Sequence, residues 1–111
     1  MGLGASQARL LLLTARKQDL ELQLQMVQQA RMQVSNMVSA LFNRSSNLDP
    51  DSKENKKLES AVSSIQERDK QLEQQSRRID TQHQAVQTEI DSVSKVISKN
   101  IESTFKLNGM G

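Results

Sequence analysis

The sequence predicts an all-α protein, an antiparallel two-helix hairpin of coiled-coil type whose C-terminal helix is the longer one. Apolar residues recur at every seventh position in both halves of the chain, which is the spacing of a helix that packs along another helix. Neither half is interrupted by Gly or Pro. The hydrophobic content is only 35%, with two Phe and no Trp or Tyr, which argues against a thick globular core.

The length of 111 residues fits one domain, and we expect residues 1–111 to form a single helical hairpin. The net charge is +2, and Lys and Arg form no block on either half of the chain. A nucleic-acid site would need a clustered basic face, ideally with stacking aromatic residues, so none is expected. The chain has no cysteine, which excludes disulfides and thiolate metal sites, and no cofactor is expected.

The first helix is expected at about residues 6–42, with Ser6 as its N-cap. Its seven-residue series should form an intrachain seam against the second helix. The members of that series are Leu13, Leu20, Val27, Val34 and Leu41. Four consecutive leucines, Leu10 to Leu13, surround the helix over one turn and therefore indicate burial on every side.

A turn is expected at residues 43–49, followed by the second helix at about residues 50–106. Asp49 would be the N-cap and Pro50 the first helical residue. Asn108 or Gly109 would end the helix as a left-handed cap. The seam of this helix consists of Leu58, Ile65, Leu72, Ile79, Val86 and Val93.

The companion positions of this second seam are polar in the middle of the helix, where Asp69, Ser76 and His83 stand. Polar residues at such positions fix the register of a coiled coil, and we interpret all three in this way. His83 is the only histidine and has no cysteine or second histidine with which to bind a metal. No nucleophile–base pair or phosphate-binding loop is visible, so the sequence does not predict an enzyme.

The two helices differ in length, at about 37 and about 56 residues, or roughly 55 and 84 Å. Counted outward from the turn, Ser6 should lie beside Val86, and everything past about Ile90 should overhang. Such an exposed apolar stripe marks an interaction surface. We expect a subunit interface made of Leu10, Leu11, Leu12, Leu13, Ile90, Val93, Val96, Ile97, Ile101 and Phe105.

The closing run VSKVISKNIESTFK (residues 93–106) resembles the C-terminal end of type III secretion needle proteins, and the turn NLDPDSKENKKL resembles their Asn/Pro-containing loop. The opening ASQARLLLLTARKQDLELQLQMVQQARMQV is similar to the N-terminal helices of flagellar axial proteins. The chain is longer than a typical needle subunit and lacks the tyrosine common in the second helix of that family. The resemblance implies unfolded export through a type III-like channel and polymerisation into a helical tube.

The leading hypothesis is therefore a structural subunit of a self-assembling helical filament or tube. Its main partners would be other copies of the same chain, and an export apparatus or a chaperone would be a further partner. The alternative is a coiled-coil adaptor or scaffold hairpin that forms a closed oligomer or binds a partner helix. A weaker third hypothesis has Leu10–Leu13 inserting into a membrane as part of a translocator.

No apolar run reaches the ~20 residues that span a bilayer, and Leu10–Leu13 is too short for a signal-peptide core. The expected location is extracellular or at the cell surface, after export without a cleaved signal peptide. The alternative location is the cytoplasm.

Overall fold

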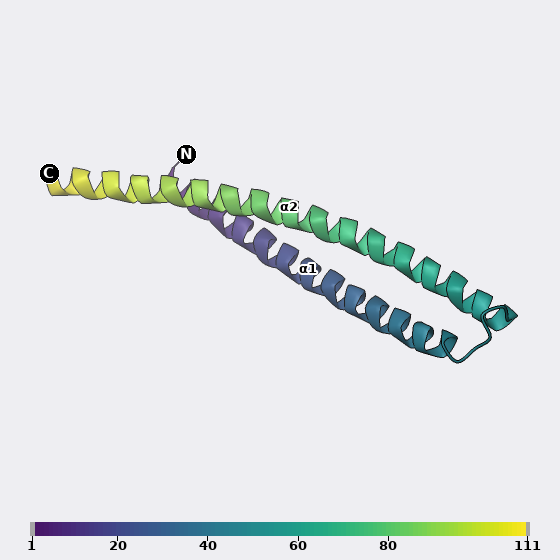
Figure 1. Cartoon of the computed structure of the whole chain (residues 1–111). Helices are drawn as coiled ribbons and strands as arrows, with labels where there is room; N and C mark the ends of the chain where they lie inside the picture. The colour runs from purple at the N-terminus through teal and green to yellow at the C-terminus, as the bar shows by residue number, and fades with distance from the viewer. Residues whose placement is uncertain (1, 111) are drawn as a thin grey trace. The chain divides into compact units, whose positions relative to one another are not determined.

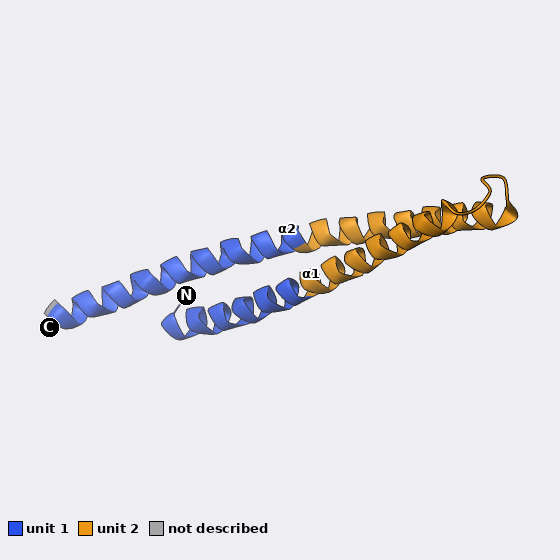
Figure 2. Ribbon diagram, turned by 60° about the horizontal axis from the view of Figure 1, so that its bottom comes forward, with its two compact units in different colours: residues 1–22, 80–111 blue, residues 23–79 orange. Residues whose placement is uncertain are grey.

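The computed structural model describes residues 2–110, which form two helices, α1 (Leu3–Ser45) and α2 (Lys53–Met110). The helices pack antiparallel as a hairpin, and α2 is the longer, with 58 residues against 43 (Figure 1). The predicted fold class is confirmed. The chain divides into two compact units, each with a stretch of both helices (Figure 2). Unit 1 comprises residues 1–22 and 80–111, and unit 2 comprises residues 23–79.

The first helix begins earlier than the sequence indicated. Ser6 lies inside α1, where its backbone N–H donates to the carbonyl of Gly2 at 2.9 Å, and its side chain is fully buried. The prediction of Ser6 as an N-cap is therefore wrong. Ser6 is one seven-residue step before Leu13, so it occupies a seam position. Its buried hydroxyl has no hydrogen-bond partner among the described residues.

The second helix begins at Lys53, three residues later than expected, because the segment Asp49–Ser52 forms a turn. The Asp49 carboxylate accepts the N–H of Asp51 at 3.2 Å, and the Asp49 carbonyl accepts the N–H of Ser52 at 3.0 Å. Ser52 is the N-cap of α2, since its hydroxyl accepts the N–H of Asn55 at 3.1 Å. The prediction that Asp49 caps a helix starting at Pro50 is wrong.

Asn55 holds the turn against both helices of unit 2 and is only 5% exposed. Its side-chain carbonyl accepts the hydroxyl of Ser45, the last residue of α1. Its side-chain NH₂ donates to the carbonyl of Pro50 at 3.1 Å. One buried amide thus joins the end of α1, the connecting turn and the first turn of α2. A buried amide is stable only when such partners satisfy it.

The C-terminal end of α2 continues through Met110. Gly109 has no positive φ angle, and neither has any other described residue. The left-handed cap predicted at Asn108 or Gly109 is therefore wrong.

Each unit has a narrow core in which side chains of the two helices meet. In unit 2 the buried apolar residues are Val27, Val62, Leu72 and Ile79. In unit 1 they are Leu13, Leu20 and Val86. Burying such a side chain contributes about 1.5–3 kcal/mol, so this seam is the main apolar contribution to the stability of each unit.

Replacing Leu20 by Ala tests how much this seam contributes to the free energy of unfolding. Leu20 is 2% exposed, so Leu20→Ala should lower the free energy of unfolding by about 2–3 kcal/mol, as large-to-small changes in a core do. The matched control is Leu22→Ala, because Leu22 is 55% exposed and should change stability by no more than about 0.5 kcal/mol. Urea unfolding of dilute protein, followed by circular dichroism, measures both. Equal losses of stability in the two variants would contradict the assignment of Leu20 to the buried seam.

Candidate interaction surface

The seam residues predicted from the seven-residue series all lie on the facing sides of the helices. In unit 2, Val27, Leu72 and Ile79 are buried, and in unit 1, Leu13, Leu20 and Val86 are buried. The remaining five are half-buried, namely Val34, Leu41, Leu58 and Ile65 in unit 2 and Val93 in unit 1.

Asp69, one of the polar seam residues, binds an arginine of the facing helix in unit 2. The Arg31 guanidinium donates two hydrogen bonds, from Nε to Asp69 Oδ1 at 3.0 Å and from an Nη to Oδ2 at 3.2 Å. Both side chains are little more than one-third exposed. The hydrogen bond from Arg31 lowers the pKa of Asp69 and the same bond raises the pKa of Arg31. This two-point contact stabilises one register in unit 2.

Sequence reasoning did not identify Arg31. The signal was present, because Arg31 lies one seven-residue step after Leu24 and one before Val38. A basic residue between two apolar members of a seven-residue series calls for an acidic partner across the seam. Without the correct antiparallel register, however, Asp69 could not be recognised as that partner.

The other two polar seam residues are half-buried. His83 Nε2 lies 3.1 Å from Glu21 Oε1, and the same carboxylate oxygen lies 4.0 Å from Lys17 Nζ. Ser76 is half-buried in unit 2. Among residues 2–110, no group of three His, Cys, Asp or Glu side chains is arranged to hold a metal ion.

The register of unit 1 differs from the one counted from the sequence. Arg9 pairs with Glu89 at 2.7 Å, and Ser6 lines a shallow groove with Ser92, Val93 and Val96. The prediction that Ser6 lies beside Val86 is therefore wrong by about two turns of α2. The count outward from the turn began at the wrong pair of residues. It paired Phe42 with Pro50, whereas Ser45 and Asn55 face each other at the turn.

The corrected register shortens the overhang. Ile90, Val93 and Ile97 are half-buried within unit 1, and Asn100 is the last half-buried residue of α2 up to Gly109. We call residues 101–109, all of which are exposed, the α2 tail. Its large apolar side chains are Ile101, Phe105 and Leu107, exposed by 52%, 78% and 71%. Leu107 was not among the predicted interface residues.

The leucine run of α1 divides into two pairs. Leu13 is buried in the seam and Leu10 is half-buried, so their own chain covers them. Leu11 and Leu12 point away from the seam and are 73% and 66% exposed. The prediction of burial on every side is thus met within the chain for only half of the run.

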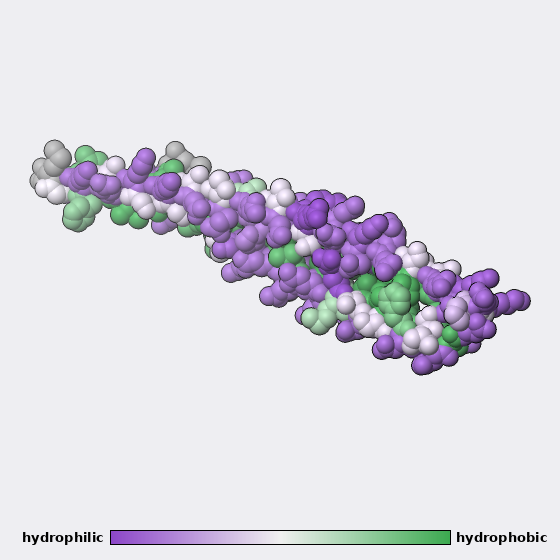
Figure 3. Space-filling model, viewed as in Figure 1, coloured by the Kyte–Doolittle hydropathy of each residue, from purple (hydrophilic) through white to green (hydrophobic). Residues whose placement is uncertain are grey.

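Further exposed apolar side chains follow along α1 and were not predicted as interface residues. They are Leu22, Met26, Met32, Met37 and Phe42. By contrast, α2 exposes no large apolar side chain between residues 53 and 95, and Val96 is the first that it exposes. Figure 3 shows hydrophobic surface at the end of α2 and a largely hydrophilic surface along its middle. The apolar surface available to a partner therefore lies on α1 and on the last turns of α2.

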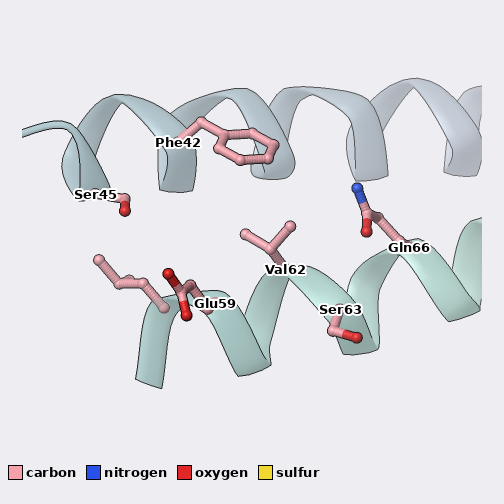
Figure 4. A pocket seen from close by; sticks show the side chains of 7 residues that line it. Phe42, Ser45, Glu59, Val62, Ser63 and Gln66 are labelled. Carbon is pink, nitrogen blue, oxygen red and sulfur yellow. The ribbon is translucent and has the colours of Figure 1, made fainter. Parts of the chain in front are cut away.

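An open groove lies near the turn in unit 2 (Figure 4). Phe42 and Ser45 reach it from α1, and Glu59, Val62 and Gln66 reach it from α2. Ser45, Ser63 and Glu59 supply most of its polar lining. What it offers a partner is the exposed ring of Phe42, beside the buried Val62.

No family model, no curated protein and no solved structure matches this chain. The resemblance to secretion needle subunits therefore rests on the short motifs quoted above, and only the antiparallel hairpin is established. No described helix is long and apolar enough to cross a membrane.

Replacing the Arg31–Asp69 pair tests its role in the register. The single variant Asp69→Leu should lower the melting temperature, because it leaves Arg31 in the seam without its carboxylate. The double variant Arg31→Leu/Asp69→Leu should melt above the single variant and above wild type, since it converts the pair into an apolar layer. Circular dichroism melts of dilute protein measure this. A double variant no more stable than the single one would contradict the seam position of both residues.

Because of the Arg31–Asp69 pair, the stability of the protein should depend on pH in the acidic range. Because the folded-state pKa of Asp69 is lowered, its contribution is complete above about pH 4 and is lost as the pH falls through the folded-state value. The stability advantage of the double variant over wild type should therefore widen below about pH 4. Unfolding of both proteins between pH 7 and pH 2 measures this, and a difference that does not change with pH would show that the pair is not formed in solution.

Proposed function

We propose that this protein is the structural subunit of a self-assembling helical filament or tube. The observation that carries the proposal is the α2 tail, nine consecutive exposed residues that include Ile101, Phe105 and Leu107. When another surface covers apolar side chains that face water, the free energy of the system falls. The tail belongs to a continuous helix and is not covered by α1, and in this proposal another copy of the chain supplies the covering surface.

Two further features support self-assembly. Exposed apolar residues on α1 give each chain a second uncovered surface, separate from the tail. The short motifs that resemble secretion needle subunits lie at the turn and at residues 93–106, a segment that includes the first six residues of the tail. The proposal includes, as that resemblance implies, export without a cleaved signal peptide and assembly outside the cell.

The alternative is an adaptor hairpin that forms a closed oligomer or binds a partner helix. The row of exposed Met and Leu side chains on α1 favours it, because such residues adapt to varied helical partners. Electron microscopy of the concentrated protein separates the two proposals. Fibres of uniform diameter support the filament subunit, and discrete particles support the adaptor.

Substituting Ile101 by Asp tests the role of the tail. Ile101 is 52% exposed, so Ile101→Asp should leave the helix content of dilute protein almost unchanged. In an assembly, the carboxylate would enter an apolar contact without a partner, which costs several kcal/mol and should raise the concentration needed for assembly by at least about tenfold. Pelleting of concentrated protein measures this.

The matched control is Ser103→Asp, an exposed tail position two residues after Ile101 and therefore on the opposite side of the helix. This variant should assemble at nearly the wild-type concentration. If dilute Ile101→Asp lost helix, the side chain would be packed within its own chain. If both variants pelleted like wild type, the tail would not be part of the contact.

A further inference from the structure

The side of α1 that faces away from α2 in unit 1 carries a second row of residues with coiled-coil spacing. We call this row the outer α1 seam, and it consists of Ala8, Leu12, Ala15, Asp19 and Leu22. Successive members are four or three residues apart, the same spacing that the buried seam has, and all five are exposed. A row with this spacing fits another helix. α1 is therefore built to contact helices on two sides, although its own chain covers only one.

The tail of the same chain cannot cover the outer α1 seam. α2 is one continuous helix through Met110, and within unit 1 it runs along the opposite side of α1. Residues beyond Asn100 lie past the half-buried part of α2 and face no part of α1. Both the outer α1 seam and the α2 tail are consequently left uncovered in a single chain.

The two uncovered surfaces of unit 1 complement each other in side-chain size. The tail presents bulky residues in steps of four, Ile101 and Phe105, which continue from Ile97. In the outer α1 seam, Ala8 and Ala15 stand on either side of Leu12, and these two small side chains leave room for such bulk. Helices pack densely when large residues of one face small residues of the other.

Two tails facing each other would match less well. They would place bulky side chains against bulky side chains. When the tail of each copy contacts the outer α1 seam of the next, every copy takes part in two contacts.

We propose that the outer α1 seam is the docking site for the α2 tail of a second copy of this chain. This inference rests on the proposed self-assembly and names its contact. The two contacting surfaces differ, so the interface is heterologous. Each copy that docks leaves one tail and one outer α1 seam open for further copies, and assembly is open-ended unless the rotation closes a ring.

Disulfide mapping tests the contact directly, because the chain contains no cysteine. The test protein is the double variant Ala15→Cys/Asn108→Cys. Ala15 lies in the outer α1 seam, and Asn108 is one turn beyond Phe105 on the tail, so no apolar tail residue is lost. Mild oxidation of the concentrated protein should give a ladder of disulfide-linked multimers on a denaturing gel. In the control Ala15→Cys/Thr88→Cys, the second cysteine is on the exposed face of α2, and the ladder should be at least about tenfold weaker.

The single-cysteine variants distinguish the other arrangements. Ala15→Cys and Asn108→Cys should form few dimers when oxidised separately, and an equal mixture should form mainly the mixed dimer. Dominant dimers of Asn108→Cys alone, or of Ala15→Cys alone, would overturn the inference in favour of a symmetric contact. Fibres without a ladder would also overturn it while leaving the proposed self-assembly intact. Absence of any assembly by light scattering in wild-type protein would overturn both.

Discussion

Two antiparallel helices can cover only the facing side of each other, and this geometric limit determines the rest of the structure. In each unit the covered side is a narrow row of residues, and the buried apolar residues of both helices lie in it. Any apolar residue outside that row is exposed in a single chain. Leu12, Leu22 and Phe105 are exposed for this reason, although residues of this kind are normally buried in a larger core.

Polar contacts in and beside the seam add specificity to this packing. In unit 2 the hydrogen bonds of Arg31 with Asp69 and of Ser45 with Asn55 are compatible with a single alignment of the helices. In unit 1 the contacts of Arg9 with Glu89 and of Glu21 with His83 have the same effect. A slip by one heptad would separate each pair and place charged groups opposite apolar side chains. The apolar series alone would tolerate such a slip, because it repeats every seven residues.

The two helices and most of the apolar residues that face inward could be predicted from the sequence, because a seven-residue period without Gly or Pro has few structural alternatives. The sequence was insufficient for the alignment of the two helices. That alignment depends on Asn55, a residue with no apolar signal, whose contacts with Ser45 and Pro50 exist only once the turn has formed. The mistaken start at Pro50 followed from the general preference of proline for the first turn of a helix, which here was outweighed by the Asp49–Ser52 turn and the Ser52 cap.

The error in alignment also affected the candidate interface. Ile90 and Val93 were expected to overhang and are half-buried, whereas Leu107 and the exposed apolar residues of α1 beyond Leu12 were missed. A seam residue and an interface residue have the same apolar character in a sequence, and only the register separates them.

The central claim is that the apolar side chains left uncovered by the hairpin become covered when copies of the chain associate. Amide hydrogen exchange of residues 101–109, measured as a function of protein concentration, tests it most directly. In dilute protein the tail has no packing partner, and its amides should exchange much faster than those near Val86. At concentrations where the protein assembles, the tail amides should become strongly protected. Exchange that stays equally fast at every concentration, in protein that does assemble, would contradict the claim.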